Sequence, residues 1–229
     1  MDKLETVIWD VDGTIVNSFP AHHEWFEGFF QRRFGKLFPF TPDQLREAGK
    51  DMPHPEFYNL LANMAGDTTF SWEREGKQLE KEYASHMDSA EHRLVHGITV
   101  ALYRLESRGI NQGIATNRDM PTSQRDLVRL LGNTDYFKAI VCPNERLRKK
   151  PNPDVIIEAM HLLKCSRPEN AIYVGDMPID VQAGKEAGAI TVALYFDGVS
   201  YSTRKELEDA KPDHIIKRPE DLLNIALRN

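Results

Sequence analysis

Cysteine is scarce in this chain of 229 residues, which holds only Cys142 and Cys165. Neither stands in a spacing typical of a disulfide framework, a zinc site or a redox motif, so we expect free thiols and a reducing compartment. Long apolar runs are also missing, and Met1 leads through two charged residues into a strand-like run without the apolar segment of a secretion signal. The sequence therefore predicts a cytoplasmic protein with no membrane partner.

An excess of positive charge is lacking too, because 35 acidic residues outnumber 29 Lys and Arg and leave a formal net charge of −6. Nucleic acids and anionic membranes are bound by clustered basic side chains, so neither is expected as a partner. A hydrophobic content of 41% allows a substantial core, and the length suits one domain plus an insert. We expect a monomer or a homodimer.

A short apolar run near the start of the chain ends on two carboxylates. Residues 7–9 lead into Asp-Val-Asp-Gly-Thr at positions 10–14. The run delivers Asp10 to a strand tip, and Gly13 permits a sharp turn whose backbone amides can face an anion. One carboxylate can attack a phosphoryl group while the other handles the proton, which suits transfer through an aspartyl-phosphate. Asp-Gly is also a common turn pair, so this segment alone equally fits a solvated loop.

Two segments past the middle of the chain bring a hydroxyl group and positive charge. A strand-like run ends on Thr116 and Asn117. Residues 149–154, Lys-Lys-Pro-Asn-Pro-Asp, form a basic loop that leads into a helix start. On charge alone, either Lys149 or Lys150 can neutralise a phosphoryl group.

A further acidic pair follows a buried-looking run at residues 171–174. Gly175 and Asp176 end this run, and Asp180 follows one helical turn later. By itself, Asp180 also fits a carboxylate at a helix N-terminus, where the helix dipole favours negative charge.

Strand-like runs alternate with helical patterns over most of the chain, which predicts a three-layer α/β fold built on a doubly wound parallel sheet. In such sheets, ligands bind outside the carboxyl ends of the strands. Asp10, Thr116 and Asp176 each follow such an end, so we expect them in one crevice. The runs are residues 6–9, 110–115, 139–141, 172–174, 191–194 and 214–216.

The alternation breaks between about residues 19 and 94, which read as several helices without a clear strand. We therefore assign residues 1–17 and 96–229 to the α/β core and residues 18–95 to an inserted, all-helical cap. Aromatic side chains at helical spacing are expected in the cap's own core: Trp25, Phe26, Phe29, Phe30 and Phe34. His92 and His96 lack a third ligand at metal spacing, so we expect a surface pair at a helix end.

In this order, the four motifs resemble those of the haloacid dehalogenase-like hydrolases, which are Asp-x-Asp, a Thr or Ser, a Lys, and Gly-Asp-x-x-x-Asp. The resemblance covers about residues 4–18 and 95–225. Within the family, Thr-Asn-Arg at positions 116–118 is similar to the Thr-Asn-Lys of phosphoglycolate phosphatases. The resemblance implies a Rossmann-like core with a helical cap. It also implies a phosphatase that acts on a small phosphorylated metabolite, either phosphoglycolate-like or a sugar phosphate.

The resemblance further implies a role for each motif residue. Asp10 would be the nucleophile, and Asp12 would protonate the leaving alcohol and later activate water. Thr116 would bind a phosphoryl oxygen, and Lys150 rather than Lys149 would neutralise the developing charge.

A magnesium site is implied as well. Mg²⁺ prefers oxygen ligands, and Asp10, Asp176 and the backbone carbonyl of Asp12 would provide them. Asp180 would orient the lysine or a metal-bound water.

Four more positions are candidates for binding substrate or phosphate: Gly13, Asn117, His22 and Lys50. Asn117 would donate its backbone amide to phosphate. His22 stands at the hinge into the cap, where relatives keep a polar group. Lys50 lies in residues 49–54, the candidate loop over the leaving group, and would read a carboxylate or a second phosphate.

Two other functions fit the same motifs. A phosphomutase resembling β-phosphoglucomutase would return the phosphoryl group to a sugar instead of water, and would differ in how well the cap excludes water. A non-catalytic phosphate-binding or regulatory protein would keep the fold without turnover. The retained acidic, hydroxyl and lysine groups argue against the second of these.

Overall fold

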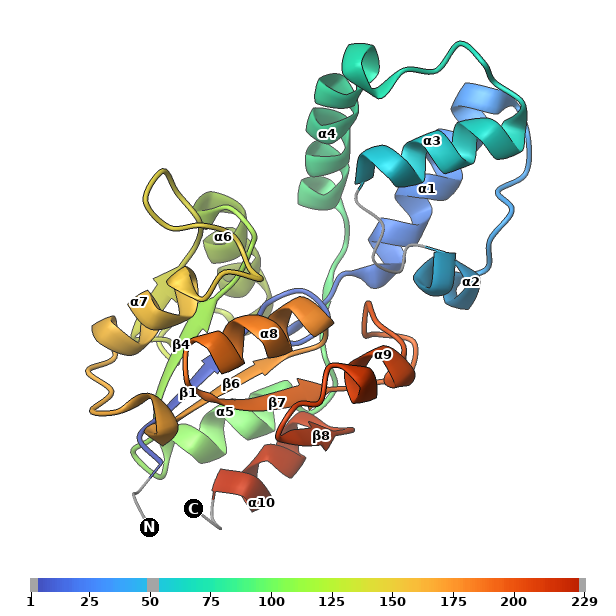
Figure 1. Cartoon of the computed structure of the whole chain (residues 1–229). Helices are drawn as coiled ribbons and strands as arrows, with labels where there is room; N and C mark the ends of the chain where they lie inside the picture. The colour runs from blue at the N-terminus through green and yellow to red at the C-terminus, as the bar shows by residue number, and fades with distance from the viewer. Residues whose placement is uncertain (1–3, 49–53, 227–229) are drawn as a thin grey trace. The chain divides into compact units, whose positions relative to one another are not determined.

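The computed structural model describes residues 4–48 and 54–226, and the chain divides into two compact units (Figure 1). The sheet unit joins the stretch up to Asn17 with the stretch from His92 onward, and the helical unit runs from Ser18 to Glu91. The sequence-based division placed residues 92–95 in the cap. In the structure they group with the sheet unit, because β3 (Arg93–Leu94) pairs antiparallel with β2 (Val16–Asn17).

A six-stranded parallel sheet forms the centre of the sheet unit in the described part of the chain, which confirms the doubly wound α/β fold. The spatial order is β5-β4-β1-β6-β7-β8. From β1, the sheet therefore extends through β4 and β5 in one direction and through β6, β7 and β8 in the other. The neighbours β4, β1 and β6 therefore end side by side at the switch of strand order, where open sheets of this kind bind ligands. The strands are β1 (Thr6–Trp9), β4 (Asn111–Ala115), β5 (Ala139–Val141), β6 (Ala171–Gly175), β7 (Ile190–Leu194) and β8 (His214–Ile216).

Helices cover both faces of this sheet, so the unit has three layers, with the sheet between two layers of helices. Successive side chains of a strand point to opposite faces, so Val7 and Trp9 pack on one face and Ile8 on the other. The first face is covered by α5 (Ile98–Glu106), α6 (Met120–Leu131) and α10 (Leu222–Ala226). The second is covered by α7 (Asp154–Leu162) and α8 (Pro178–Glu186). The remaining elements are α9 (Arg204–Asp209) and the short 3₁₀ turns Pro168–Asn170 and Pro219–Asp221.

The helical unit consists of α1 (Phe19–Phe34), α2 (Pro42–Ala48), α3 (His54–Ala65) and α4 (Trp72–Ser89) (Figure 1). Its core is aromatic, as predicted: four of the five expected side chains are buried, and Phe34 packs edge-on against two of them. The indole of Trp25 donates a 2.6 Å hydrogen bond to the hydroxyl of Tyr58 on α3, which satisfies the indole N–H inside this core.

A histidine lies among these aromatic side chains. The Nδ1 atom of His22 is 2.9 Å from the hydroxyl of Tyr83, and its ring meets that of Phe26 edge-on at 5.0 Å. Burial lowers the pKa of His22 to about 3, and the nearby His54, His23 and Arg46 add to the shift. His22 is therefore neutral at pH 7.

This lowered pKa predicts acid destabilisation of the helical unit. The unfolded chain binds a proton at this side chain near pH 6.5, whereas the folded chain does not until about pH 3, so stability falls as the pH drops between these values. The free energy of unfolding can be measured by urea unfolding followed by tryptophan fluorescence. Between about pH 7 and pH 5, its decrease should be about 1–2 kcal/mol smaller in His22→Gln than in wild type. Exposed His96 gives the matched control, His96→Gln, which should keep the wild-type pH dependence. Equal pH dependence in wild type and His22→Gln would contradict the assignment.

Candidate active site

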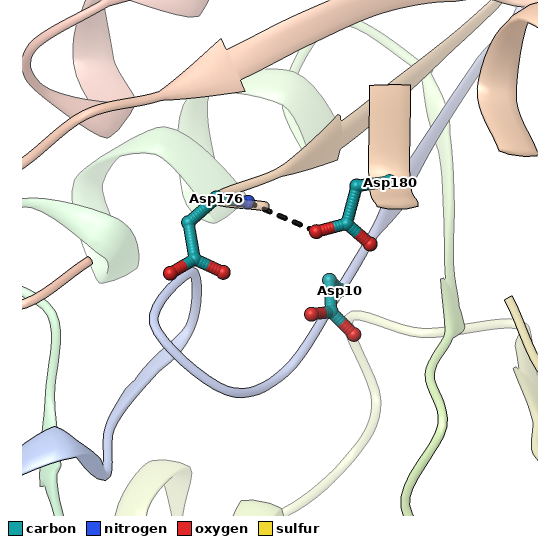
Figure 2. Close-up of side chains that lie close together, drawn as sticks. All are labelled: Asp10, Asp176 and Asp180. Atoms are coloured by element: carbon teal, nitrogen blue, oxygen red, sulfur yellow. Dashed lines mark hydrogen bonds between the residues drawn. The ribbon is translucent and has the colours of Figure 1, made fainter. Parts of the chain in front are cut away.

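Three acidic side chains converge at the carboxyl edge of the sheet. Asp10 follows β1, Asp176 follows the adjacent β6, and Asp180 lies in the first turn of α8. Figure 2 shows their carboxylates gathered around one space, and one ligand oxygen from each lies within 4.8 Å of the others. All three side chains are buried.

Gly13 is required by the approach of the first loop to Asp176. Its φ is +68°, a left-handed conformation that side chains disfavour. A Cβ atom at this position would also lie 2.0 Å from Oδ2 of Asp176. Figure 2 shows this loop passing close to the Asp176 carboxylate. The glycine thus makes room for the carboxylate.

Lys150 is the positive centre of the cluster. Its Nζ lies 2.8 Å from Oδ1 of Asp10 and 2.6 Å from Oδ1 of Asp180. Burial disfavours the charged amine, but the two carboxylates outweigh burial and raise the pKa of Lys150 above its ordinary value. Lys149 is exposed, so the structure brings Lys150 and not Lys149 to the acidic side chains.

Asp180 holds the lysine and the start of α8 at once. Its Oδ2 accepts hydrogen bonds from the backbone N–H groups of Asp176, at 3.2 Å, and Met177, at 3.0 Å. Its Oδ1 faces Lys150 and the hydroxyl of Tyr173. The same side chain therefore contacts both the start of α8 and Lys150, while its predicted role in orienting the lysine or a metal-bound water stays a prediction.

Tyr173 contacts the side chain of Lys150, and Asn117 contacts its backbone. The Tyr173 hydroxyl accepts a 2.9 Å hydrogen bond from Nζ of Lys150 and lies 2.9 Å from the carbonyl oxygen of Ala115. The Asn117 amide accepts from the backbone N–H of Lys150 at 2.8 Å and donates to its carbonyl at 3.1 Å. Tyr173 was not among the residues predicted from the sequence, although a tyrosine inside a buried strand indicates a hydroxyl that needs a partner.

Asp176 carries the acceptor atom that fits a cation. Oδ2 accepts a 2.6 Å hydrogen bond from the backbone N–H of Tyr201, while the buried Oδ1 has no hydrogen-bond partner in the described residues. Burial, together with Asp180 and Asp10, raises the pKa of Asp176 well above its ordinary value. Three carboxylates face a single ammonium group here, so a divalent cation would offset the excess of negative charge.

Asp12 lies beside this cluster with a partly exposed side chain. Its Oδ2 is 3.0 Å from Nε of Arg118, a residue to which the sequence analysis gave no role. Thr116, buried at the end of β4, accepts a hydrogen bond from the backbone N–H of Arg118 at 3.3 Å.

His22 belongs to the helical unit, and Lys50 lies outside the described residues. The prediction of a surface pair at a helix end was wrong for His92. This side chain is 5% exposed, lies beyond the end of α4 at Ser89, and places Nε2 3.8 Å from a carboxylate oxygen of buried Asp126.

Comparison with known proteins identifies the family. The profile of the haloacid dehalogenase-like hydrolases matches residues 7–194. The chain belongs to this family. The matched region begins in β1 and ends with β7, so it includes every residue of the acidic cluster.

Relatives point to phosphatases within the family. A phosphoglycolate phosphatase of Rhodobacter capsulatus is 31% identical over 212 residues, which is 90% of this chain and 89% of the relative. A pyrophosphatase of Halalkalibacterium halodurans is 25% identical over 233 residues, with 98% and 97% coverage. Together with family membership, these relatives confirm the prediction of a haloacid dehalogenase-like phosphatase.

A solved structure agrees on the fold over the whole length. The crystal structure of a predicted phosphoglycolate phosphatase from Haemophilus somnus has a TM-score of 0.80 at 20% identity, with 98% of this chain and 99% of that chain covered.

Within residues 4–48 and 54–226, no helix combines the length and apolarity needed to cross a bilayer.

The burial of Lys150 predicts a large effect on stability. Lys150→Met would leave Asp10 and Asp180 buried without their cation, and breaking a buried ion pair in this way costs roughly 3 kcal/mol or more. Urea unfolding in the presence of a chelator measures the loss. The matched control is Lys149→Met at the exposed neighbour, which should stay within about 0.5 kcal/mol of wild type. Equal stability of the two variants would contradict this description of the site.

Proposed function

We propose that the protein is a Mg²⁺-dependent phosphatase that hydrolyses a small phosphorylated metabolite through an aspartyl-phosphate on Asp10. The observation that carries the proposal is the position of Asp10 at the tip of β1. There its carboxylate lies 2.8 Å from the Lys150 amine and close to Asp176, with Asp12 two residues further along.

Charge neutralisation is the first requirement of this reaction. A phosphate monoester carries anionic oxygens that repel a carboxylate nucleophile, so catalysis depends on positioning and positive charge. The raised pKa of Lys150 keeps its amine charged throughout the neutral range. Mg²⁺, held by Asp10, Asp176 and the backbone carbonyl of Asp12, would supply further positive charge to the phosphoryl oxygens. The oxygen-only donor set and the unpaired Oδ1 of Asp176 support this assignment.

The transfer takes place in two steps. An Asp10 oxygen attacks phosphorus, the bond from phosphorus to the leaving oxygen breaks, and Asp12 gives its proton to that oxygen. Asp12 then takes a proton from water as the water oxygen attacks phosphorus, which releases inorganic phosphate and restores the Asp10 carboxylate. The Thr116 hydroxyl donates a hydrogen bond to a phosphoryl oxygen, and Asp180 keeps the Lys150 amine directed at the reacting group.

The relatives support the proposed substrate class. The 31% identity with a phosphoglycolate phosphatase supports a small phosphorylated carboxylic acid as the substrate, and a sugar phosphate is the other member of the proposed class. Neutral His22 would contribute a hydrogen bond rather than an ion pair to such a substrate. Lys50 would bind its second anionic group.

Cys142 and Cys165 are free thiols, in keeping with the cytoplasmic location expected from the sequence.

Phosphate release tests the proposal. We expect release from at least one member of a panel of phosphoglycolate, sugar phosphates, nucleotides, pyrophosphate and an aryl phosphate, in the presence of Mg²⁺ and not after chelation. Asp10→Asn removes the nucleophile and should lower kcat by at least roughly a thousandfold.

A matched control separates the nucleophile from a general loss of charge. Asp154→Asn changes a carboxylate that pairs with exposed Arg148 at the start of α7, and it should stay within about twofold of wild type. Full Mg²⁺-dependent turnover by Asp10→Asn would refute the covalent route. An isomerised sugar phosphate without phosphate release would identify a mutase, and inactivity on the whole panel would favour a binding protein.

A further inference from the structure

Arg118 connects two carboxylates that lie on different elements. Its Nε is 3.0 Å from Oδ2 of Asp12, in the loop after β1, and its Nη1 is 2.9 Å from Oδ2 of Asp126, on α6. The guanidinium is planar and presents its N–H groups in a fixed arrangement, so two such contacts determine its orientation as well as its place.

Asp126 is a rigid anchor for this arginine. Its side chain is fully buried, and the guanidinium of Arg129 on the same helix approaches its other oxygen to 3.4 Å. Nε2 of buried His92 lies 3.8 Å from Oδ2, the oxygen that Arg118 also contacts. A carboxylate enclosed in this way cannot move without exposing a buried charge, so it keeps Arg118 in place.

Arg118 itself is nearly buried, whereas Asp12 is not. The side chain of Arg118 is 10% exposed and that of Asp12 is 28% exposed. A partly exposed carboxylate at a loop has several rotamers open to it, and contact with a fixed guanidinium restricts that choice. The backbone N–H of Arg118 also donates to Oγ1 of Thr116, so one residue contacts both Asp12 and the hydroxyl at the end of β4.

We propose that Arg118 is a positioning residue for proton transfer: anchored by Asp126, it holds the Asp12 carboxylate in the orientation from which Asp12 exchanges its proton with the leaving group and with water. The inference rests on the proposed function, because it needs Asp12 to act as acid and base. Arg118 acts through Asp12 and not on the substrate, so its loss affects kcat and leaves KM nearly unchanged.

A double-mutant cycle with Asp12 is the test. On the best substrate of the panel, Arg118→Ala should lower kcat roughly 10- to 100-fold, as small misplacements of catalytic groups do, with KM within about threefold of wild type. Once Asp12→Asn has removed the carboxylate that Arg118 positions, adding Arg118→Ala should lower kcat by no more than about threefold. Arg118→Lys, which keeps the charge but not the planar fork, should restore part of the activity.

The matched control is Arg204→Ala. Arg204 also pairs with a carboxylate, with Nε 2.7 Å from Oε1 of Glu208, but its side chain is 50% exposed and has no part in the arrangement around Asp12, so the variant should stay within about twofold of wild type. Circular dichroism and thermal melting report whether each variant is folded. If Arg118→Ala does not fold, the cycle with Arg118→Lys replaces it and carries the same expectation of non-additive losses.

The outcomes distinguish this inference from the proposed function. Multiplicative losses in the cycle, a rise in KM at unchanged kcat, or full activity of Arg118→Ala would overturn the role of Arg118 while an active, Asp12-dependent wild type kept the phosphatase proposal. An inactive wild type, or an Asp12→Asn variant with full activity, would overturn the proposed function and this inference together.

Discussion

The site depends on the balance of charge around a single buried lysine. Asp10, Asp176 and Asp180 share one space at the carboxyl edge of the sheet, and Lys150 is in direct contact with two of them. Buried charges of one sign repel strongly in a low dielectric, so such a cluster persists only if each group is held and partly neutralised. Two of the surrounding contacts serve this end, namely the hydroxyl of Tyr173 and the side-chain amide of Asn117.

A second set of charges involves Asp12, and under the proposed mechanism the two sets have different roles. The lysine cluster surrounds Asp10, the proposed nucleophile, and holds more negative than positive charge, an imbalance that a divalent cation would reduce. Arg118, which also pairs with Asp126, contacts Asp12, the proposed acid and base. Asp10 and Asp12 are separated by one residue, so a single strand end presents one carboxylate to each set.

The fold and the acidic residues were predictable because their signals are local. Apolar runs alternating with helical patterns indicate a parallel sheet, and an acidic residue just after such a run marks its carboxyl end. The contacts of four other side chains were not predicted because they join residues far apart in the chain. These side chains are Tyr173, Asp126, His92 and Asn117. His92, for example, meets Asp126 only through tertiary packing, which the spacing from His92 to His96 does not reveal. The choice of Lys150 over its neighbour likewise depended on the resemblance to a family motif, since the two adjacent lysines carry the same charge.

Detection of phosphorylated Asp10 tests the central claim most directly. Wild-type protein would be mixed with the best substrate and Mg²⁺, quenched in acid within one turnover, digested, and analysed by mass spectrometry. We expect one added phosphoryl group on the peptide that contains Asp10, formed and lost at rates compatible with kcat, and absent in Asp10→Asn. Release of phosphate with no phosphorylated Asp10 at any time in the turnover, or with the phosphoryl group on another residue, would contradict it.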